Sequence, residues 1–165
     1  IADVTHKRLR ISRRVWRPGV VHAIYGSYND SVGQLIAGYF VRNSGYPITG
    51  PYTAIGWIED EKIVGQAVFN DYTGANIEIH LHYPWGINRK TVKDVYKYVF
   101  KQLKCERLTA KPYCTNETLL HLLTRLGFVY EFTQEAYYRE GNKVIDAVVY
   151  KLTKNNIPKW VNIDA

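Results

Sequence analysis

The segment 76–82 places three side chains that can transfer protons at every second position: Glu78, His80 and His82. Apolar residues stand between them, so the pattern predicts a β-strand with one polar and one apolar face. A carboxyl and an imidazole on one strand face can take up or release a proton during a reaction. Two other interpretations stay open: a solvent-facing strand surface, or a zinc site. Zinc is the weaker of the two, because no third His or Cys stands at ligand spacing.

The residues that follow this strand favour binding of an anion. A loop over 83–88 separates the strand from a helix predicted over 88–103, which begins near Asn88 or Arg89. Backbone N–H groups and the positive dipole end at a helix N-terminus attract phosphate. Arg89 and Lys90 add positive side chains beside that end. The segment therefore predicts a phosphate-binding site.

Apolar periodicity and turn residues define the other elements. We expect helices over 30–41 and 117–126, and strands over 52–58, 62–70, 107–111, 128–139 and 143–152. The strand–helix–strand unit in the middle predicts one parallel pair within an otherwise antiparallel sheet, and hence an α+β domain. Asp30 or Ser31 can cap the first helix. The leucines of 119–126 are expected in the core, and the first helix is expected to carry an apolar stripe of Val32, Leu35, Ile36, Tyr39 and Phe40.

Length and composition indicate a soluble domain without a disulfide scaffold. The 165 residues, 46% hydrophobic and 22% charged, suit one domain spanning 1–165, with a basic segment 1–17 and a polar tail 154–165 that packs loosely. The two cysteines lack framework spacing, which indicates a reducing, cytoplasmic location. No apolar run approaches the ~18 residues of a membrane span, and the basic segment lacks the apolar stretch of a secretory signal.

The charge balance favours an anionic partner. Lys and Arg total 22 against 15 acids, a net charge of +7. The basic cluster 6–17 is compatible with nucleic-acid binding or with a flexible arm, and we favour the arm. Only Lys90 is assigned a functional role among the lysines at 90, 93, 97, 101 and 104, which are spaced as a solvated helix face.

Residues 52–152 resemble the GNAT acetyltransferase family, most closely its RimJ/RimL-like branch and small acetyltransferases of phage genomes. The most specific stretch is 107–116 (RLTAKPYCTN), followed by 119–128 (LLHLLTRLGF) with its terminal Leu-Gly-Phe. The family loop usually reads Arg/Gln-x-x-Gly-x-Gly/Ala. In the loop 83–88 only Gly86 matches that pattern, so the detailed phosphate contacts must differ.

The resemblance implies the GNAT fold: a mixed, mostly antiparallel sheet with a central splayed parallel pair, 76–82 and 107–111, flanked by helices. It implies acetyl-CoA as the cofactor and an amine acceptor on a protein, a small molecule or a modified nucleobase. The net charge favours an acidic or phosphate-bearing acceptor. Glu78 is the first choice as catalytic base, and His80 the second. The implied cofactor-binding residues are His82, Tyr83, Trp85, Gly86, Ile87, Asn88, Arg89, Lys90 and Asn116.

Two competing hypotheses come from other functional classes. The family's general-acid tyrosine corresponds to Leu123, and although Tyr113 or Cys114 could replace it, no motif places either there. This departure, with the altered loop, fits a catalytically silent GNAT-fold binding or structural protein. The basic surface fits a nucleic-acid-binding protein. We expect a monomer or a homodimer, located in the host cytoplasm if the origin is a phage.

Overall fold

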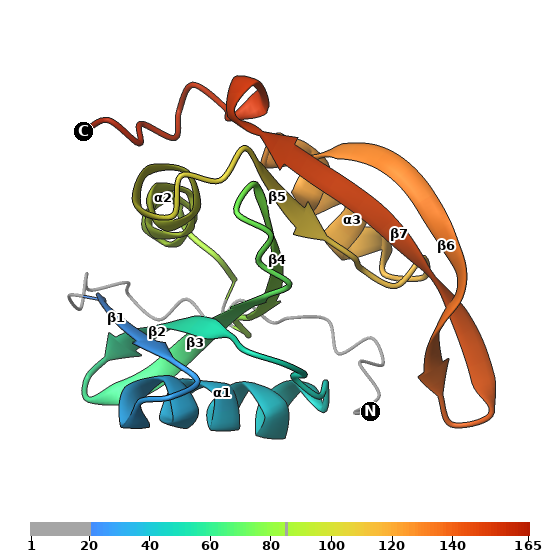
Figure 1. Cartoon of the computed structure of the whole chain (residues 1–165), viewed down its shortest axis with the longest axis horizontal. Helices are drawn as coiled ribbons and strands as arrows, with labels where there is room; N and C mark the ends of the chain where they lie inside the picture. The colour runs from blue at the N-terminus through green and yellow to red at the C-terminus, as the bar shows by residue number, and fades with distance from the viewer. Residues whose placement is uncertain (1–20, 85) are drawn as a thin grey trace, which may run out of the picture. The chain divides into compact units, whose positions relative to one another are not determined.

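The computed structural model describes residues 21–84 and 86–165 (Figure 1). Its strands form one mixed sheet. The strand order is β1-β2-β3-β4-β5-β7-β6. The expectations for segment 1–17 and for Trp85 lie outside the described residues. The strands are β1 (His22–Ser27), β2 (Thr53–Glu59), β3 (Lys62–Asn70), β4 (Asn76–His82), β5 (Arg107–Ala110), β6 (Val129–Glu140) and β7 (Lys143–Thr153). The helices are α1 (Ser31–Ser44), α2 (Arg89–Tyr96) with a π-helical continuation (Lys97–Gln102), and α3 (Glu117–Arg125).

Two compact units make up the described residues. Unit 1 contains those up to Val68 together with Leu81–Gly86, and unit 2 contains Phe69–His80 together with Ile87–Ala165. The expected α+β architecture is confirmed, because β4 and β5 are parallel in a sheet whose other registered pairs are antiparallel. Among the described helices, none has the length and apolarity needed to cross a membrane. One domain over 1–165 stays a prediction.

In unit 1, helix α1 packs on β1 and β2 and begins at the expected cap. The Asp30 carboxylate accepts a hydrogen bond from the Gly33 backbone N–H at 2.6 Å, which satisfies one of the free N–H groups of the first turn. The predicted apolar stripe was partly wrong: Val32, Leu35 and Tyr39 are exposed. The face against the sheet is Gly33, Ile36, Ala37 and Phe40.

The close approach of α1 to β1 explains why the buried face of α1 differs from the predicted one. A Cβ atom on Gly33 would lie 2.1 Å from the Ser27 carbonyl oxygen, so only glycine allows this turn of the helix to contact the strand. Strand β1 itself was not predicted. Its six residues include Ala23 and Gly26, which have low strand propensity, and it is held by antiparallel pairing with β2.

In unit 2, the helix expected over 88–103 forms as α2 and its π-helical continuation. Its apolar residues Val92, Val95, Tyr96, Val99 and Phe100 are buried. The wider π-turn, closed by the Leu103 N–H donating to the Tyr98 carbonyl at 2.9 Å, buries Tyr98 as well. Of the α3 leucines expected in the core, only Leu123 is fully buried, and the others are half-buried.

The tail 154–165 packs against the helix rather than loosely. Val161 is buried, Lys97 donates to the Ala165 carbonyl oxygen at 2.6 Å, and Lys101 forms an ion pair with Asp164. The lysine row is therefore only partly a solvated face. The apolar anchor and the two lysine contacts hold the tail in place.

We expect Gly127→Ala to destabilise the protein by more than about 2 kcal/mol. Gly127 follows α3 with φ of 95°, and a Cβ there would lie 2.2 Å from the Asn156 carbonyl oxygen. Gly38→Ala in α1 is the control, because a Cβ at Gly38 meets nothing within 4 Å. That substitution should stabilise by up to about 1 kcal/mol. Urea unfolding of both variants measures the difference, and equal effects would contradict the close contact.

Candidate active site

The parallel strands β4 and β5 part in the middle of unit 2. Their register contains three pairs, from Asn76 opposite Arg107 to Glu78 opposite Thr109. Strand β5 stays paired with β7 along its whole length, and the contact extends to the Val148 N–H donating to the Pro112 carbonyl at 3.0 Å. The β4–β5 ladder therefore ends at Glu78 while β5 continues along β7. This is the splayed pair that was expected.

The Glu78 side chain lies buried where the strands part. It is only 4% exposed, so the interpretation of this strand face as solvent-facing is wrong for Glu78. One carboxylate oxygen, Oε2, lies 3.6 Å from Lys111 Nζ, and the other, Oε1, lies 3.9 Å from His80 Nε2. Burial raises the pKa of Glu78; Lys111 opposes this shift and Asp71 adds to it. A carboxyl with a raised pKa is suited to accept a proton near neutral pH.

His80 lies beside Glu78 and is neutral over the physiological range. Burial lowers its pKa to about 4. Its Nε2 lies 2.8 Å from Asn70 Oδ1, and because that oxygen only accepts, Nε2 carries the ring hydrogen. The ring therefore supports the strand geometry as a hydrogen-bond donor, and its low pKa makes it a weaker base than Glu78.

The expected cofactor residues of unit 1 are His82, Tyr83 and Gly86. Burial lowers the pKa of His82. The Tyr83 ring packs 5.8 Å from the Trp57 ring, measured between centroids, and covers Gly65. The Gly86 N–H donates to the Tyr83 carbonyl at 3.1 Å. The loop amide at the one position that matches the family motif thus closes a turn.

The start of α2 supplies the anion-attracting groups of unit 2. Asn88 Oδ1 accepts from the Thr91 N–H at 2.9 Å, so this cap already satisfies one of the helix amides. The amides of Arg89 and Lys90 have no acceptor within the helix, since they belong to its first turn. The Arg89 guanidinium lies 5.7 Å from the centre of the Trp160 ring, and Lys90 forms an ion pair with Asp94 at 2.8 Å. Arg89 is the better placed of the two for a phosphate.

The remaining expected residues have local structural roles. Ile87 is half-buried. Asn116 caps α3, accepting from the Leu119 N–H at 3.2 Å. The Tyr113 ring stacks 4.3 Å from Tyr138, and burial raises its pKa, with a further contribution from Glu140. Each of these roles is compatible with a structural function alone. Contact of Ile87 and Asn116 with a cofactor stays a prediction, and so does a general-acid role for Tyr113.

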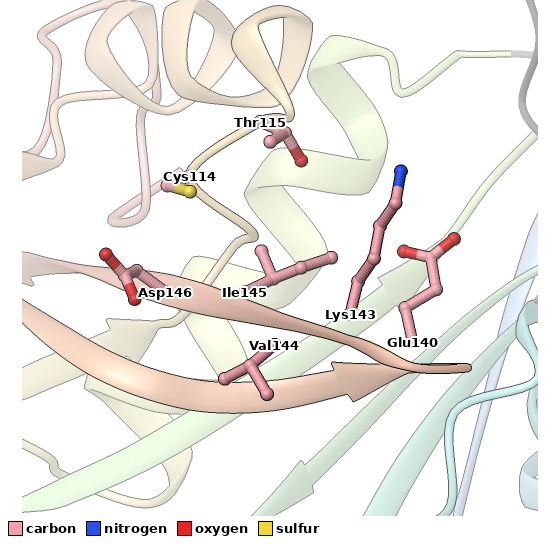
Figure 2. Close-up of a pocket in the computed structure, with 7 residues that line it drawn as sticks. All are labelled: Cys114, Thr115, Glu140, Lys143, Val144, Ile145 and Asp146. Carbon is pink, nitrogen blue, oxygen red and sulfur yellow. The ribbon is translucent and has the colours of Figure 1, made fainter.

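A hollow of about 530 Å³ lies beside the loop before α3 (Figure 2). The exposed thiol of Cys114 borders it. In Figure 2, Glu140 and Lys143 extend from the turn between β6 and β7, while Cys114 and Thr115 come from the facing loop. The hollow is lined by Cys114, Thr115, Glu140, Lys143, Val144, Ile145 and Asp146.

Two of the side chains that interact with Glu78, those of Asp71 and Lys111, were not predicted from the sequence. Asp71 follows β3 with φ of 55°, and Lys111 follows β5. Neither belongs to the alternating pattern that contains Glu78, so the spacing of residues carried no signal for either. Within the described residues, no three His, Cys, Asp or Glu side chains gather as metal ligands.

Solved structures of acetyltransferases share this fold. A spermidine N-acetyltransferase from Vibrio cholerae aligns with a TM-score of 0.65 and 11% identity, covering 81% of this chain and 94% of that one. A GNAT-family acetyltransferase from Bacillus anthracis aligns with a TM-score of 0.54 and 21% identity, covering 62% and 66%. A ribosomal-protein-S5-alanine acetyltransferase from Vibrio fischeri aligns with a TM-score of 0.57 and 16% identity, covering 76% of this chain and 71% of that one.

The fold is that of the GNAT acetyltransferases. No family profile matches the sequence, and no curated protein matches it. The chain spans 61%, 66% and 63% of the length of three acetyltransferase structures that it matches. At these identities the similarity establishes the GNAT fold.

We expect the His80 ring to stay neutral until the pH falls to about 4, the pKa that burial gives it. Because this pKa is lower in the folded than in the unfolded chain, His80 contributes stability above pH 6.5 that is lost as the pH falls toward 4. Nitrogen-detected NMR should show the hydrogen on Nε2. Ordinary titration near pH 6.5, as in a solvent-exposed histidine, would contradict the buried position.

Proposed function

We propose that the chain is an N-acyltransferase that transfers an acyl group, first of all acetyl, from acyl-CoA to an amine. The observation that carries the proposal is the buried Glu78 carboxyl at the point where β4 and β5 part. In a GNAT fold this places a carboxyl of raised pKa beside the gap between the parallel strands. Perturbed carboxyls at such positions are candidates for catalysis.

The reaction requires an amine without its extra proton. An aliphatic ammonium has a pKa of ~10.4, so a base must remove a proton before the nitrogen can attack. Glu78 serves as this base and His80, neutral at pH 7, orients the strand beside it. Acyl-CoA supplies an activated thioester carbonyl. Backbone N–H groups of β4 stabilise the oxygen of the tetrahedral intermediate.

The groups that fit the cofactor's phosphates lie at the start of α2. Arg89 contributes its backbone N–H and its guanidinium, Lys90 contributes its N–H, and Asn88 fixes the first turn. The proposed phosphate contact is supported by the attraction of anions to the free N–H groups and the positive dipole end of a helix N-terminus. His82, Tyr83, Gly86, Ile87 and Asn116 remain in the proposed binding set, as does Trp85.

The acceptor in this proposal is an amine. The matched structures are named for spermidine and for an alanine of a ribosomal protein, both of which present amino groups. A RimJ/RimL-like or phage origin, a cytoplasmic location and a monomeric or homodimeric state are further parts of the proposal.

One observation favours a silent binding protein as the second candidate. Leu123, at the family's general-acid position, is buried and has no proton to donate. In that case the chain would bind CoA without turnover. Nucleic-acid binding rests on the basic cluster 6–17, which the structure does not describe.

We expect Glu78→Gln to lower the turnover of acetyl-CoA with an amine panel by about a hundredfold or more, as loss of a general base does. Acetyl-CoA affinity should change much less, because the amide is nearly isosteric with the carboxyl. Thiol release measures the first quantity and isothermal titration the second. Glu135→Gln removes an exposed carboxylate and is the matched control. Equal turnover in the Glu78→Gln and Glu135→Gln variants would show that Glu78 is not the base.

We expect Arg89→Ala to weaken acetyl-CoA binding by about tenfold, the loss of one charge-assisted contact. Lys104→Ala, which removes an exposed positive charge beyond the helix end, should leave the affinity within about twofold. Isothermal titration at two salt concentrations measures both. If the two variants lose the same affinity, the contribution is general charge rather than a phosphate contact at α2.

A further inference from the structure

We propose that Lys111 is an acyl acceptor within the chain, so that the protein acylates its own Lys111 from an acyl thioester. The inference rests on the proposed N-acyltransferase function and adds a modification site to it. The observation behind it is the position of the Lys111 ammonium, 3.6 Å from Glu78 Oε2 and 5.1 Å from the centre of the Tyr137 ring.

Lys111 stands where the two parallel strands have already parted. It follows Ala110, the last residue of β5, and the β4–β5 ladder ends one position earlier, at Thr109. Its backbone is fixed by the Tyr138 hydroxyl, which donates to the Lys111 carbonyl at 2.5 Å. The ammonium is therefore held where β4 and β5 part, next to the carboxylate that we propose as the base.

The environment of Lys111 differs from that of other lysines in ion pairs. Lys90, Lys101 and Lys154 pair with carboxylates while their side chains are 45–52% exposed. The Lys111 side chain is 19% exposed, and its carboxylate partner is 5% exposed. Surface pairs of the first kind contribute little and interchange readily with water. The Lys111–Glu78 pair instead keeps an amine next to a buried base.

This arrangement supplies what amide formation requires. Glu78 removes one proton from the ammonium, and the freed Nζ lone pair attacks the thioester carbonyl carbon. The new C–N bond remains when the tetrahedral intermediate collapses and the C–S bond breaks. The departing thiolate takes up a proton, so that the products are a neutral amide at Lys111, a free thiol and one released proton. No oxidant or reductant is needed, and the amine does not have to diffuse in.

The modification also changes the site that produces it. The groups facing Glu78 are Lys111, His80 and Asp71, and the Tyr137 ring faces Lys111 from β6. The positive charge of Lys111 lowers the pKa of Glu78. Amide formation removes that charge, so the Glu78 carboxyl then loses its proton only at higher pH. We therefore expect self-acylation to shift the low-pH side of the pH–activity profile toward higher pH.

The test uses the full chain with deuterated acetyl-CoA and maps the label by mass spectrometry over time. Lys62, exposed in the β2–β3 hairpin, is the internal reference for chemical acylation. We expect label at Lys111 at least tenfold faster than at Lys62, with a first-order rate that is unchanged over a hundredfold range of protein concentration. Lys111→Arg keeps the positive charge and should abolish the label in that peptide.

Glu78→Gln separates a catalysed reaction from a chemical one. If Glu78 is the base, the variant labels Lys111 at least tenfold more slowly, while Lys62 and the Glu135→Gln control are unchanged. A purely chemical reaction would respond in the opposite direction, because loss of a neighbouring negative charge favours the uncharged, reactive amine. Faster labelling in Glu78→Gln would therefore overturn the inference.

The other outcomes are distinguishable as well. If the chain binds acetyl-CoA and acylates added amines while Lys111 is labelled no faster than Lys62, the internal acceptor is wrong and the proposed function stands. A rate at Lys111 that rises with protein concentration would mean transfer between molecules and would also overturn it. If acetyl-CoA does not bind, both the proposed function and the self-acylation fail.

Discussion

The arrangement of the site depends on one hydrogen-bonding constraint. Strand β5 stays paired with β7 along its length, while its parallel ladder with β4 stops at Glu78. Before that point the side-chain hydrogen bond from Thr109 to Asn76, at 2.5 Å, joins the two strands. Beyond it the strands separate, and Glu78, His80 and Lys111 occupy the opening. Because backbone pairing fixes this divergence, the position of the carboxyl does not depend on loop conformation.

Charges buried at such a point are costly unless they are paired. The ion pair with Lys111 offsets part of the free energy of burying the Glu78 carboxylate. The raised pKa of Glu78 reduces the rest, because it favours the neutral form. His80 avoids the cost of burying a charge because its ring stays neutral. A purely structural site would be served as well by apolar side chains. An acid, an imidazole and an amine that lie this close together are groups that can transfer protons.

The start of α2, where we propose that the cofactor's phosphates bind, differs from the glycine-containing loop of the GNAT family. The Asn88 side chain satisfies the Thr91 amide, which leaves the amides of Arg89 and Lys90 at the open end of the helix. Trp160 from the tail packs against the Arg89 guanidinium. A side chain held in one orientation loses less entropy on binding than a free one. The docked tail therefore has a direct consequence for the proposed phosphate contact.

Local sequence signals predicted β2 to β7 and the three helices, and they offered Asp30 or Ser31 as the cap of the first helix. The strand–helix–strand order predicted the parallel β4–β5 pair. Alternation in β4 also separated its two faces, but it could not say which face would be buried, because that depends on what packs above each one. The polar face became the buried one at Glu78. The proximity of Lys111 and Asp71 to Glu78 could not be predicted for the same reason. Strand pairing and a turn bring these two residues to Glu78 from other elements. Local pattern fixes an element, whereas the cost of burying a charge is decided only by neighbours that the tertiary structure supplies.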